Sequence, residues 1–242
     1  MLSRRSSKTE AIVIRKRNFS EKDRILTLFS RDRGKIEAIA KGSRRPGSRF
    51  SYFSDIGSIG QFYLYESKSI PIITDYKPVF SPEGARGEFK RTEKLSFAFK
   101  LVDKLFEQGQ PHDRTYSILR EVVQNISSGE SQLVFLAFLI NVIGDLGLKP
   151  ELYKCIVCSE RVDDKEELIF DSSGGICHAK CAAGESQKIS SDEIKLLRLL
   201  FDAPYNQISK ARVDSKVFEK VYKIALASLE WNFGKILPEK VL

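Results

Sequence analysis

The sequence has little histidine, few thiols and none of several motifs on which enzymes depend. Of its 242 residues only two are histidines, His112 and His178, and all four cysteines fall between residues 155 and 181. It contains no Gly-x-x-x-x-Gly-Lys-Ser/Thr phosphate loop, so ATP hydrolysis has no visible machinery. The paired His-x-Glu and Pro-Cys-x-x-Cys motifs of zinc deaminases are also missing. The sequence therefore predicts a protein that is not an enzyme.

Long apolar runs are missing as well. No stretch of about 18 apolar residues occurs, and the most apolar run, residues 133–143, is too short to span a bilayer. The first eight residues, Met-Leu-Ser-Arg-Arg-Ser-Ser-Lys, contain no apolar signal-peptide core. These absences predict a cytoplasmic protein without a membrane partner, in a compartment where thiols stay reduced.

The cysteines form two close pairs, Cys155-Ile-Val-Cys158 and Cys177-His-Ala-Lys-Cys181, separated by 18 residues. Zn²⁺ prefers four donors at tetrahedral corners, and two such pairs folded over each other supply them. The spacing therefore predicts one structural zinc ion held by Cys155, Cys158, Cys177 and Cys181, with no open position for a catalytic water. Two disulfides or four unrelated thiols are the alternatives, and His178 could replace Cys177 or Cys181 as the fourth ligand.

A small ribbon is expected around this metal. Residues 166–171 predict a short strand, and residues 172–176 predict a turn that delivers Cys177. A two-stranded ribbon of this size cannot bury a core of its own, so the metal would hold it together.

Positive charge is concentrated at the N-terminal end of the chain. The net charge is +8, and residues 1–50 hold 15 Lys or Arg against 5 Asp or Glu, whereas the other 192 residues hold 25 against 27. A positive field confined to one small region is typical of a protein that binds a phosphate backbone. A solvated basic face without a partner is the alternative.

The N-terminal third follows the two-residue period of β-strands. Strands are predicted at residues 11–17, 24–29, 35–41, 58–65 and 70–77, with a Gly-, Pro- and Ser-rich loop at 42–49 and a disordered start at 1–9. Five short strands in about 70 residues, without a helix long enough for a βαβ unit, predict a small closed barrel of the oligonucleotide-binding (OB) type. An SH3-like barrel is the alternative.

Basic side chains near the strand ends and the long loop are candidate DNA-phosphate contacts, because OB barrels pair a basic groove with stacked aromatic rings. They are Arg15, Arg17, Lys35, Lys41, Arg44, Arg45 and Arg49. Tyr63 and Tyr65 share one strand face and are candidate base-stacking residues, with the barrel core or ordinary surface as the alternative. Phe19 and Phe29 are assigned to the core.

After Pro82 the apolar period becomes 3.6 residues, and helices are predicted at 87–108, 114–127, 132–146, 191–201 and 215–234. The third is apolar on nearly every face and is expected to lie centrally, and Ser-Ser-Asp-Glu at 190–193 predicts a helix start. The fold class is therefore α+β. An OB-type barrel over 1–80 is followed by an all-helical bundle over 81–150 and 189–242, with an inserted four-cysteine zinc ribbon over 151–188.

Several segments resemble the RecO family of bacterial recombination mediators. They are Glu-Ala-Ile-Val-Ile-Arg at 10–15, Glu-Lys-Asp-Arg-Ile-Leu-Thr-Leu-Phe at 21–29, the segment 34–46 ending in Lys-Gly-Ser-Arg-Arg-Pro, and residues 62–72. The order of barrel, helices, four-cysteine insertion and final helices is similar over essentially the full chain. The Lys-Gly-Ser-Arg-Arg-Pro segment and the late Cys-x-x-Cys are specific only together. Some family members lack the ribbon cysteines, but this sequence has all four.

The resemblance implies a nucleoid-associated DNA-repair protein of the RecF pathway that binds single- and double-stranded DNA and anneals complementary strands. It also implies that the protein helps RecR to load RecA onto single strands coated with single-strand-binding protein (SSB). The helical part is expected to take up the acidic, apolar-ended SSB C-terminal tail, which requires an apolar pocket with a basic residue at its rim, such as Lys100, Lys104 or Arg120. Since charge and barrel do not separate RNA from DNA, an RNA-binding or ribosome-associated OB protein with a structural zinc is the alternative.

Overall fold

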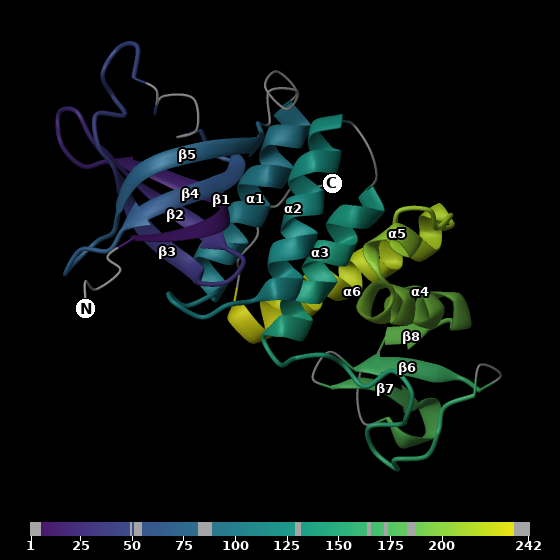
Figure 1. Cartoon of the computed structure of the whole chain (residues 1–242). Coiled ribbons are helices and arrows are strands. Elements are labelled where there is room, and N and C mark those ends of the chain that lie inside the picture. Colours follow the sequence, from purple (N-terminus) through teal and green to yellow (C-terminus); the bar gives the residue numbers. More distant parts are fainter. Residues whose placement is uncertain are drawn as a thin grey trace. The chain divides into compact units, whose positions relative to one another are not determined.

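The computed structural model describes residues 6–48, 50, 55–81, 89–128, 132–163, 166–171, 174–182 and 187–234. These residues form a five-stranded barrel, a set of helices and a small second sheet (Figure 1). The α+β class and the order of its parts are therefore confirmed. The chain divides into two compact units, one with the barrel and the helices α1 and α2, the other with the small sheet and the helices α3 to α6.

The barrel closes in the strand order β1-β2-β3-β5-β4, with β4 pairing back onto β1. Every neighbouring pair is antiparallel except β3 and β5, which meet in parallel at the single pair Ile39 and Ile72. A five-stranded barrel with one weakly closed seam is typical of the OB class. The strands are β1 (Ser6–Asn18), β2 (Arg24–Ser30), β3 (Gly34–Ala40), β4 (Ile59–Tyr65) and β5 (Ile72–Phe80).

The first strand starts earlier than its polar sequence suggests. Ser6 already pairs with Tyr65 of β4, so the prediction of disorder is wrong for residues 6–9, while residues 1–5 lie outside the described chain. Thr9 is buried, and its hydroxyl lies 2.5 Å from that of Ser30. Backbone pairing and buried hydroxyl contacts stabilise this end of β1, and hydropathy reports neither of them.

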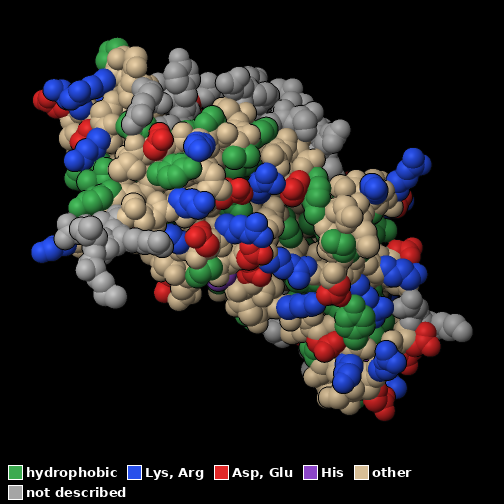
Figure 2. All heavy atoms as spheres, in the orientation of Figure 1, with side chains coloured by type: hydrophobic (Ala, Val, Ile, Leu, Met, Phe, Trp, Pro, Cys, Tyr) green, Lys and Arg blue, Asp and Glu red, His purple; other side chains and the backbone are tan. Residues whose placement is uncertain are grey.

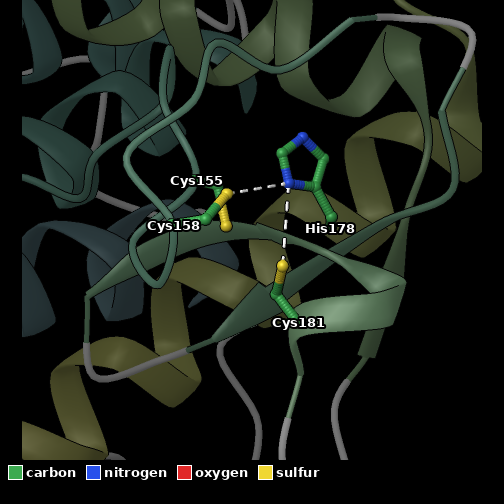
Figure 3. A group of neighbouring side chains, drawn as sticks. All are labelled: Cys155, Cys158, His178 and Cys181. Carbon is green, nitrogen blue, oxygen red and sulfur yellow. Dashed lines mark hydrogen bonds between the residues drawn. The ribbon is translucent and has the colours of Figure 1, made fainter.

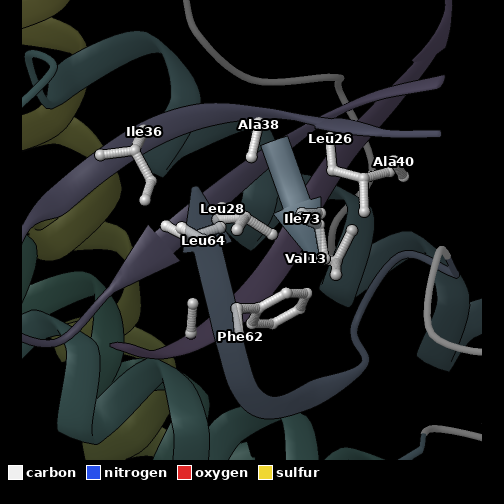
Figure 4. Packing of buried hydrophobic residues seen from close by; sticks show 10 residues of the cluster. Val13, Leu26, Leu28, Ile36, Ala38, Ala40, Phe62, Leu64 and Ile73 are labelled. Atoms are coloured by element: carbon white, nitrogen blue, oxygen red, sulfur yellow. The ribbon is translucent and has the colours of Figure 1, made fainter. Parts of the chain in front are cut away.

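Alternate residues of the strands fill the barrel interior, as the two-residue period predicts (Figure 4). The cluster consists of Ala11, Val13, Leu26, Leu28, Ile36, Ala38, Ala40, Phe62, Leu64 and Ile73. The three alanines and the large ring of Phe62 in this cluster give the mixture of small and large side chains that fits a small barrel interior.

Strand β2 is buried on its outer face as well. Ile25 and Phe29, which alternate with the interior residues, are fully buried. The ring centroid of Phe29 lies 5.7 Å from that of Phe106 and 6.3 Å from that of Tyr116. Phe106 follows α1 (Phe89–Leu105), so aromatic packing covers the outside of β2.

Helix α2 (Asp113–Ser128) is joined to β1 by a hydrogen bond and an ion pair. The hydroxyl of Tyr116 donates to the Glu10 carboxylate at 2.7 Å, and the Arg120 guanidinium lies 3.6 Å from the same carboxylate. Burial, together with the bond to Glu10, raises the pKa of Tyr116. These contacts explain why α1 and α2 group with the barrel, whereas the sequence pattern grouped residues 81–150 as one helical domain.

In the second unit, helix α3 is buried from residue 133 to residue 143 and contacts α4, α5 and α6, which confirms its predicted central place. The predicted start of α4 is also confirmed, because Ser190 and Glu193 form a reciprocal capping box. The helices are α3 (Gln132–Asp145), α4 (Ser191–Asp202), the short α5 (Tyr205–Ile208), which was not predicted, and α6 (Ser215–Phe233). Among the described helices, none is long and apolar enough to cross a membrane.

The ribbon between α3 and α4 has three strands instead of the predicted two. They pair antiparallel in the order β7-β6-β8, and a single turn of 3₁₀ helix, η2 (Ala179–Cys181), follows β7. The strands are β6 (Leu168–Asp171), β7 (Gly175–His178) and β8 (Gln187–Ile189). Strand β8 has three residues and one apolar side chain, so its sequence shows no detectable two-residue period. It was therefore not predicted.

Gly34 provides a test of the contact between the barrel and the α1–α2 connection. Its φ is +63°, and a Cβ built there would overlap the backbone oxygen of Gln110. Gly34→Ala is therefore expected to lower the free energy of unfolding by about 2 to 5 kcal/mol, from left-handed backbone strain plus overpacking. Chemical denaturation measures this loss.

Gly47→Ala is the matched control for this substitution. Gly47 has a similar φ of +73°, but a Cβ there would meet no atom within 4 Å. Only backbone strain of about 1 to 2 kcal/mol is expected. Equal losses in the two variants would show that the packing at Gln110 contributes nothing.

Candidate metal centre and nucleic-acid interface

Three cysteines and one histidine of the ribbon form a group that can hold a metal ion. One ligand atom from each of Cys155, Cys158, His178 and Cys181 lies within 4.8 Å of all the others (Figure 3). Nδ1 of His178 is 3.4 Å from Sγ of Cys158 and 3.9 Å from Sγ of Cys181.

Backbone hydrogen bonds hold the Cys155–Cys158 turn in place. The N–H of Cys155 donates to the carbonyl of Glu160 at 2.8 Å, and the N–H of Ser159 donates to the carbonyl of Cys155 at 2.9 Å. Ser159 has a φ of +63°, which lets the chain reverse directly after Cys158. The N–H of Ile156 donates to the carbonyl of Ile176 on β7 at 3.0 Å. The turn is thereby fixed beside the strand that carries His178.

Electrostatics at the group favour a cation. Burial acts to raise the pKa of the Cys155 thiol, but hydrogen bonds from nearby backbone N–H groups prevail and lower it to about 6. Burial and the neighbouring sulfurs of Cys158 and Cys155 raise the pKa of Cys181 to about 11. The Cys155 thiolate thus forms readily, and negative charge on the neighbouring sulfurs disfavours ionisation of Cys181. A divalent cation would neutralise this repulsion.

The donor set fits a tetrahedral ion. With Zn–S bonds of about 2.3 Å and Zn–N bonds of about 2.0 to 2.1 Å, tetrahedral donors stand about 3.5 to 3.8 Å apart. The 3.4 and 3.9 Å separations between His178 and its two sulfur neighbours lie close to that range. Three thiols and one imidazole fill all four positions, which is the composition of a structural site.

Glu166 contacts the imidazole nitrogen of His178 that does not face the sulfurs. Its carboxylate Oε2 lies 3.0 Å from Nε2 of the imidazole, the nitrogen that faces away from the sulfurs. A carboxylate in this place fixes the tautomer, so that Nε2 carries the proton and Nδ1 presents its lone pair to a metal. Sequence reasoning missed Glu166, because one acidic residue in a charged segment carries no signal until the fold brings it to the ring.

Cys177 does not belong to the group, although the cysteine spacing assigned it there. It lies on β7 opposite Ile169 and is buried. Successive side chains of a strand point to opposite faces, so Cys177 and His178 cannot both face the other three ligands. His178 thus replaces Cys177 in the candidate ligand set, the substitution that the sequence left open. Burial raises the pKa of the Cys177 thiol, which favours its neutral form.

Three of the basic candidates on the barrel are ion-paired with carboxylates. Arg15 lies 3.2 Å and Lys35 lies 3.6 Å from the carboxylate of Asp103, and Arg17 lies 3.1 Å from that of Glu37. The Lys35 side chain is only 12% exposed. On the face shown in Figure 2, lysine and arginine side chains lie interspersed with aspartate and glutamate. Charge over much of this surface is therefore compensated locally.

A second set of basic candidates gathers around an open depression. Lys41 and Arg45 follow β3 and line a hollow of about 570 Å³, together with Gly42 and residues 20–23 of the β1–β2 turn. We call Lys22, Lys41, Arg44 and Arg45, all exposed, the basic loop surface. Lys22 was not among the predicted contacts, and Arg49 lies outside the described residues.

The two loops of this surface are tied together by hydrogen bonds. The backbone N–H of Arg44 donates to the carbonyl of Lys22 at 3.0 Å, and its guanidinium donates to the carbonyl of Ser20 at 2.6 Å. The N–H of Gly42 donates to the Asp23 carboxylate at 2.8 Å. These hydrogen bonds thus hold together the two loops that carry the basic side chains.

Aromatic residues of the barrel do not all lie where the sequence suggested. Phe29 is fully buried, as expected, but Phe19 is 53% exposed, so its assignment to the core is wrong. Tyr65 is 37% exposed, and Lys77 Nζ lies 5.7 Å from the ring centroid of the partly buried Tyr63. Neither tyrosine lines the depression.

In the second unit, a cavity of about 160 Å³ lies between helices and ribbon. Its walls include Ile140 of α3, Phe201 of α4 and Phe170 of β6. The half-exposed Lys149 also lines it, and its ammonium lies 2.6 Å from the carboxylate of Asp202. The basic residues that the sequence suggested for such a rim, Lys100, Lys104 and Arg120, belong to α1 and α2 of the other unit.

Comparison with known proteins agrees with the resemblance. The family model described as Recombination protein O N terminal matches residues 4–82, and the one described as Recombination protein O C terminal matches residues 86–240. The chain belongs to the RecO family. It is thereby placed among proteins of DNA repair and recombination.

Curated RecO relatives match along most of their length, and each is named DNA repair protein RecO. The protein of Desulfitobacterium hafniense (strain DSM 10664 / DCB-2) is 26% identical over 233 residues, covering 94% of this chain and 85% of the relative. That of Alkaliphilus metalliredigens is 28% identical, with coverages of 90% and 89%. That of Heliobacterium modesticaldum is 30% identical, with coverages of 88% and 80%.

The ligand set of this RecO-family chain can be tested by comparing neighbouring residues. Purified protein is expected to carry one zinc per chain. Cys177→Ser should keep that zinc, whereas His178→Ala and Cys181→Ser should lose most of it, because only the latter two remove a donor. Elemental analysis after gel filtration measures the ratio. Metal loss in Cys177→Ser combined with retention in His178→Ala would restore the four-cysteine site.

Proposed function

We propose that this protein is a recombination mediator that acts by binding and not by catalysis. It binds single- and double-stranded DNA, anneals complementary strands and, together with RecR, helps to load RecA onto SSB-coated single strands. The observation that carries the proposal is the basic loop surface on an OB-type barrel in a chain of the RecO family.

The pairing of charges indicates where the backbone binds. A phosphate gains most from a cation without a carboxylate partner, since a paired cation must first give up its existing contact. Arg15, Arg17 and Lys35 are paired within the barrel unit. The guanidinium of Arg44 donates to the backbone carbonyl of Ser20, and Lys41 and Arg45 flank an open hollow. Phosphates are therefore expected on the basic loop surface.

This mode of binding suits strand annealing. Contacts to phosphates position a strand without reading its sequence, and they leave the base edges free to pair with a second strand. Neutralising phosphates also reduces the repulsion between two approaching backbones. The same electrostatics would serve RNA. Competition of a labelled DNA strand by RNA of identical sequence distinguishes the two, and family membership favours DNA.

We further propose that the group of three cysteines and His178 holds one structural zinc ion. The ion supplies binding free energy that folds the ribbon. The protein's own residues present the donors, orient the imidazole through Glu166 and leave no position for a reacting water.

For the SSB tail we propose the cavity of the second unit. An acidic peptide with an apolar end requires apolar walls and a nearby cation, because a carboxylate cannot be buried unpaired. Ile140 and Phe201 provide such walls, and Lys149 provides an ammonium group. Lys149 already pairs with Asp202 at a half-exposed position, where an incoming carboxylate can compete for it.

Matched pairs of arginines test the DNA surface. Replacing Arg44 and Arg45 by alanine should weaken binding to a fluorescent single strand and should reduce the salt slope by about 1.4, at about 0.7 per phosphate lost. Replacing Arg15 and Arg17 should change the slope by less than about half of that, because both are already paired. Fluorescence anisotropy across a salt series gives both slopes. Equal changes would place the phosphates elsewhere on the barrel.

Charge reversal tests the cavity as the tail site. Lys149→Glu should lower the affinity for a peptide of the SSB tail by about tenfold or more, since it replaces an attraction with a repulsion. Lys195→Glu, on the exposed face of α4, is the control and should change it by less than about threefold. Isothermal titration with the full chain measures both. The cavity would be the wrong site if both variants bound the peptide as tightly as the parent.

A further inference from the structure

The β1–β2 turn presents one aromatic ring beside the basic loop surface. Phe19 directly follows β1 and is 53% exposed, a large fraction for a phenylalanine. The next four residues of the chain, 20–23, line the depression together with Lys41 and Arg45. An apolar ring and a group of cations therefore share one end of the barrel.

Hydrogen bonds within the turn fix the backbone that carries this ring. The N–H of Phe19 donates to the carbonyl of Asp23 at 3.1 Å, and the hydroxyl of Ser20 accepts from the N–H of Asp23, also at 3.1 Å. Through Ser20, Lys22 and Asp23 the turn is also bonded to the loop after β3. A ring on a braced turn loses little freedom when a planar partner stacks on it.

Cations and an exposed ring together suit a single strand better than a duplex. Proteins that bind single strands combine a basic groove with aromatic side chains on which bases stack. Bases of a duplex already stack on one another, so a ring beside the duplex gains no such contact. Phosphates, in contrast, are present in both forms of DNA.

We propose that Phe19 stacks on an unpaired base of a strand whose phosphates lie on the basic loop surface, and that this contact gives the surface its preference for single-stranded DNA. This inference rests on the proposed DNA binding and adds a residue and a strand preference to it. Tyr63 and Tyr65 are less suited to the role, because they lie on β4, which contributes no residue to the depression, whereas Phe19 directly precedes its lining residues 20–23 in the chain.

Substitution at Phe19 separates stacking from charge. Phe19→Ala should weaken single-strand binding by about tenfold and leave duplex binding within about twofold, with the salt slope of both unchanged. Phe19→Trp should restore single-strand binding. Val79→Ala, at a 48% exposed apolar position on β5, is the control and should affect neither.

A direct signal comes from tryptophan fluorescence. Trp231 is the single tryptophan of the chain, so Trp231→Phe combined with Phe19→Trp leaves one fluorophore at the turn. An oligonucleotide single strand should quench it, and a blunt duplex of the same sequence should not. Quenching by both, or by neither while anisotropy shows binding, would overturn the stacking role. Absence of any DNA binding by the parent protein would instead refute the proposed function itself.

Discussion

Side chains alternate between the two faces of a β-strand, and both the barrel and the metal centre depend on this constraint. In β2, alternation sends Leu26 and Leu28 into the barrel and Ile25 and Phe29 outward, so the strand needs two apolar layers. Phe106 of the α1–α2 connection and Tyr116 of α2 contribute to its outer layer, and α1 and α2 group with the barrel in one compact unit. The same alternation in β7 turns His178 toward the other ligands and its neighbouring cysteine away from them.

The charge that the surface presents also depends on which side chains the fold brings together. The N-terminal region has a large positive balance, but carboxylates of the barrel and of α1 compensate several of its cations. The Arg44 guanidinium, in contrast, donates to the backbone carbonyl of Ser20, so this contact leaves its charge uncompensated. Net charge therefore indicates the class of partner, and the pairing pattern indicates the part of the surface that meets it.

The sequence predicted the elements whose signal is local. Strand alternation gave the five barrel strands, and apolar content gave the buried α3; the Ser190–Glu193 pattern gave the start of α4. Features that depend on a distant partner were missed, among them the polar start of β1, the short β8, the carboxylate of Glu166 behind His178 and the exposure of Phe19. Cysteine spacing located the metal group but did not show which way residue 177 points.

The ribbon also forms part of another site. Phe170 and Gly174 line the cavity of the second unit, so this wall exists only while the ribbon is folded. If a metal ion holds the ribbon together, metal binding and formation of the cavity are thermodynamically coupled. Suppose that a ligand binds only to the formed cavity. Thermodynamic reciprocity then requires that the ligand raises the affinity for the metal by the same factor by which the metal raises the affinity for the ligand. The ribbon would thereby couple metal binding to ligand binding at the cavity within its own unit.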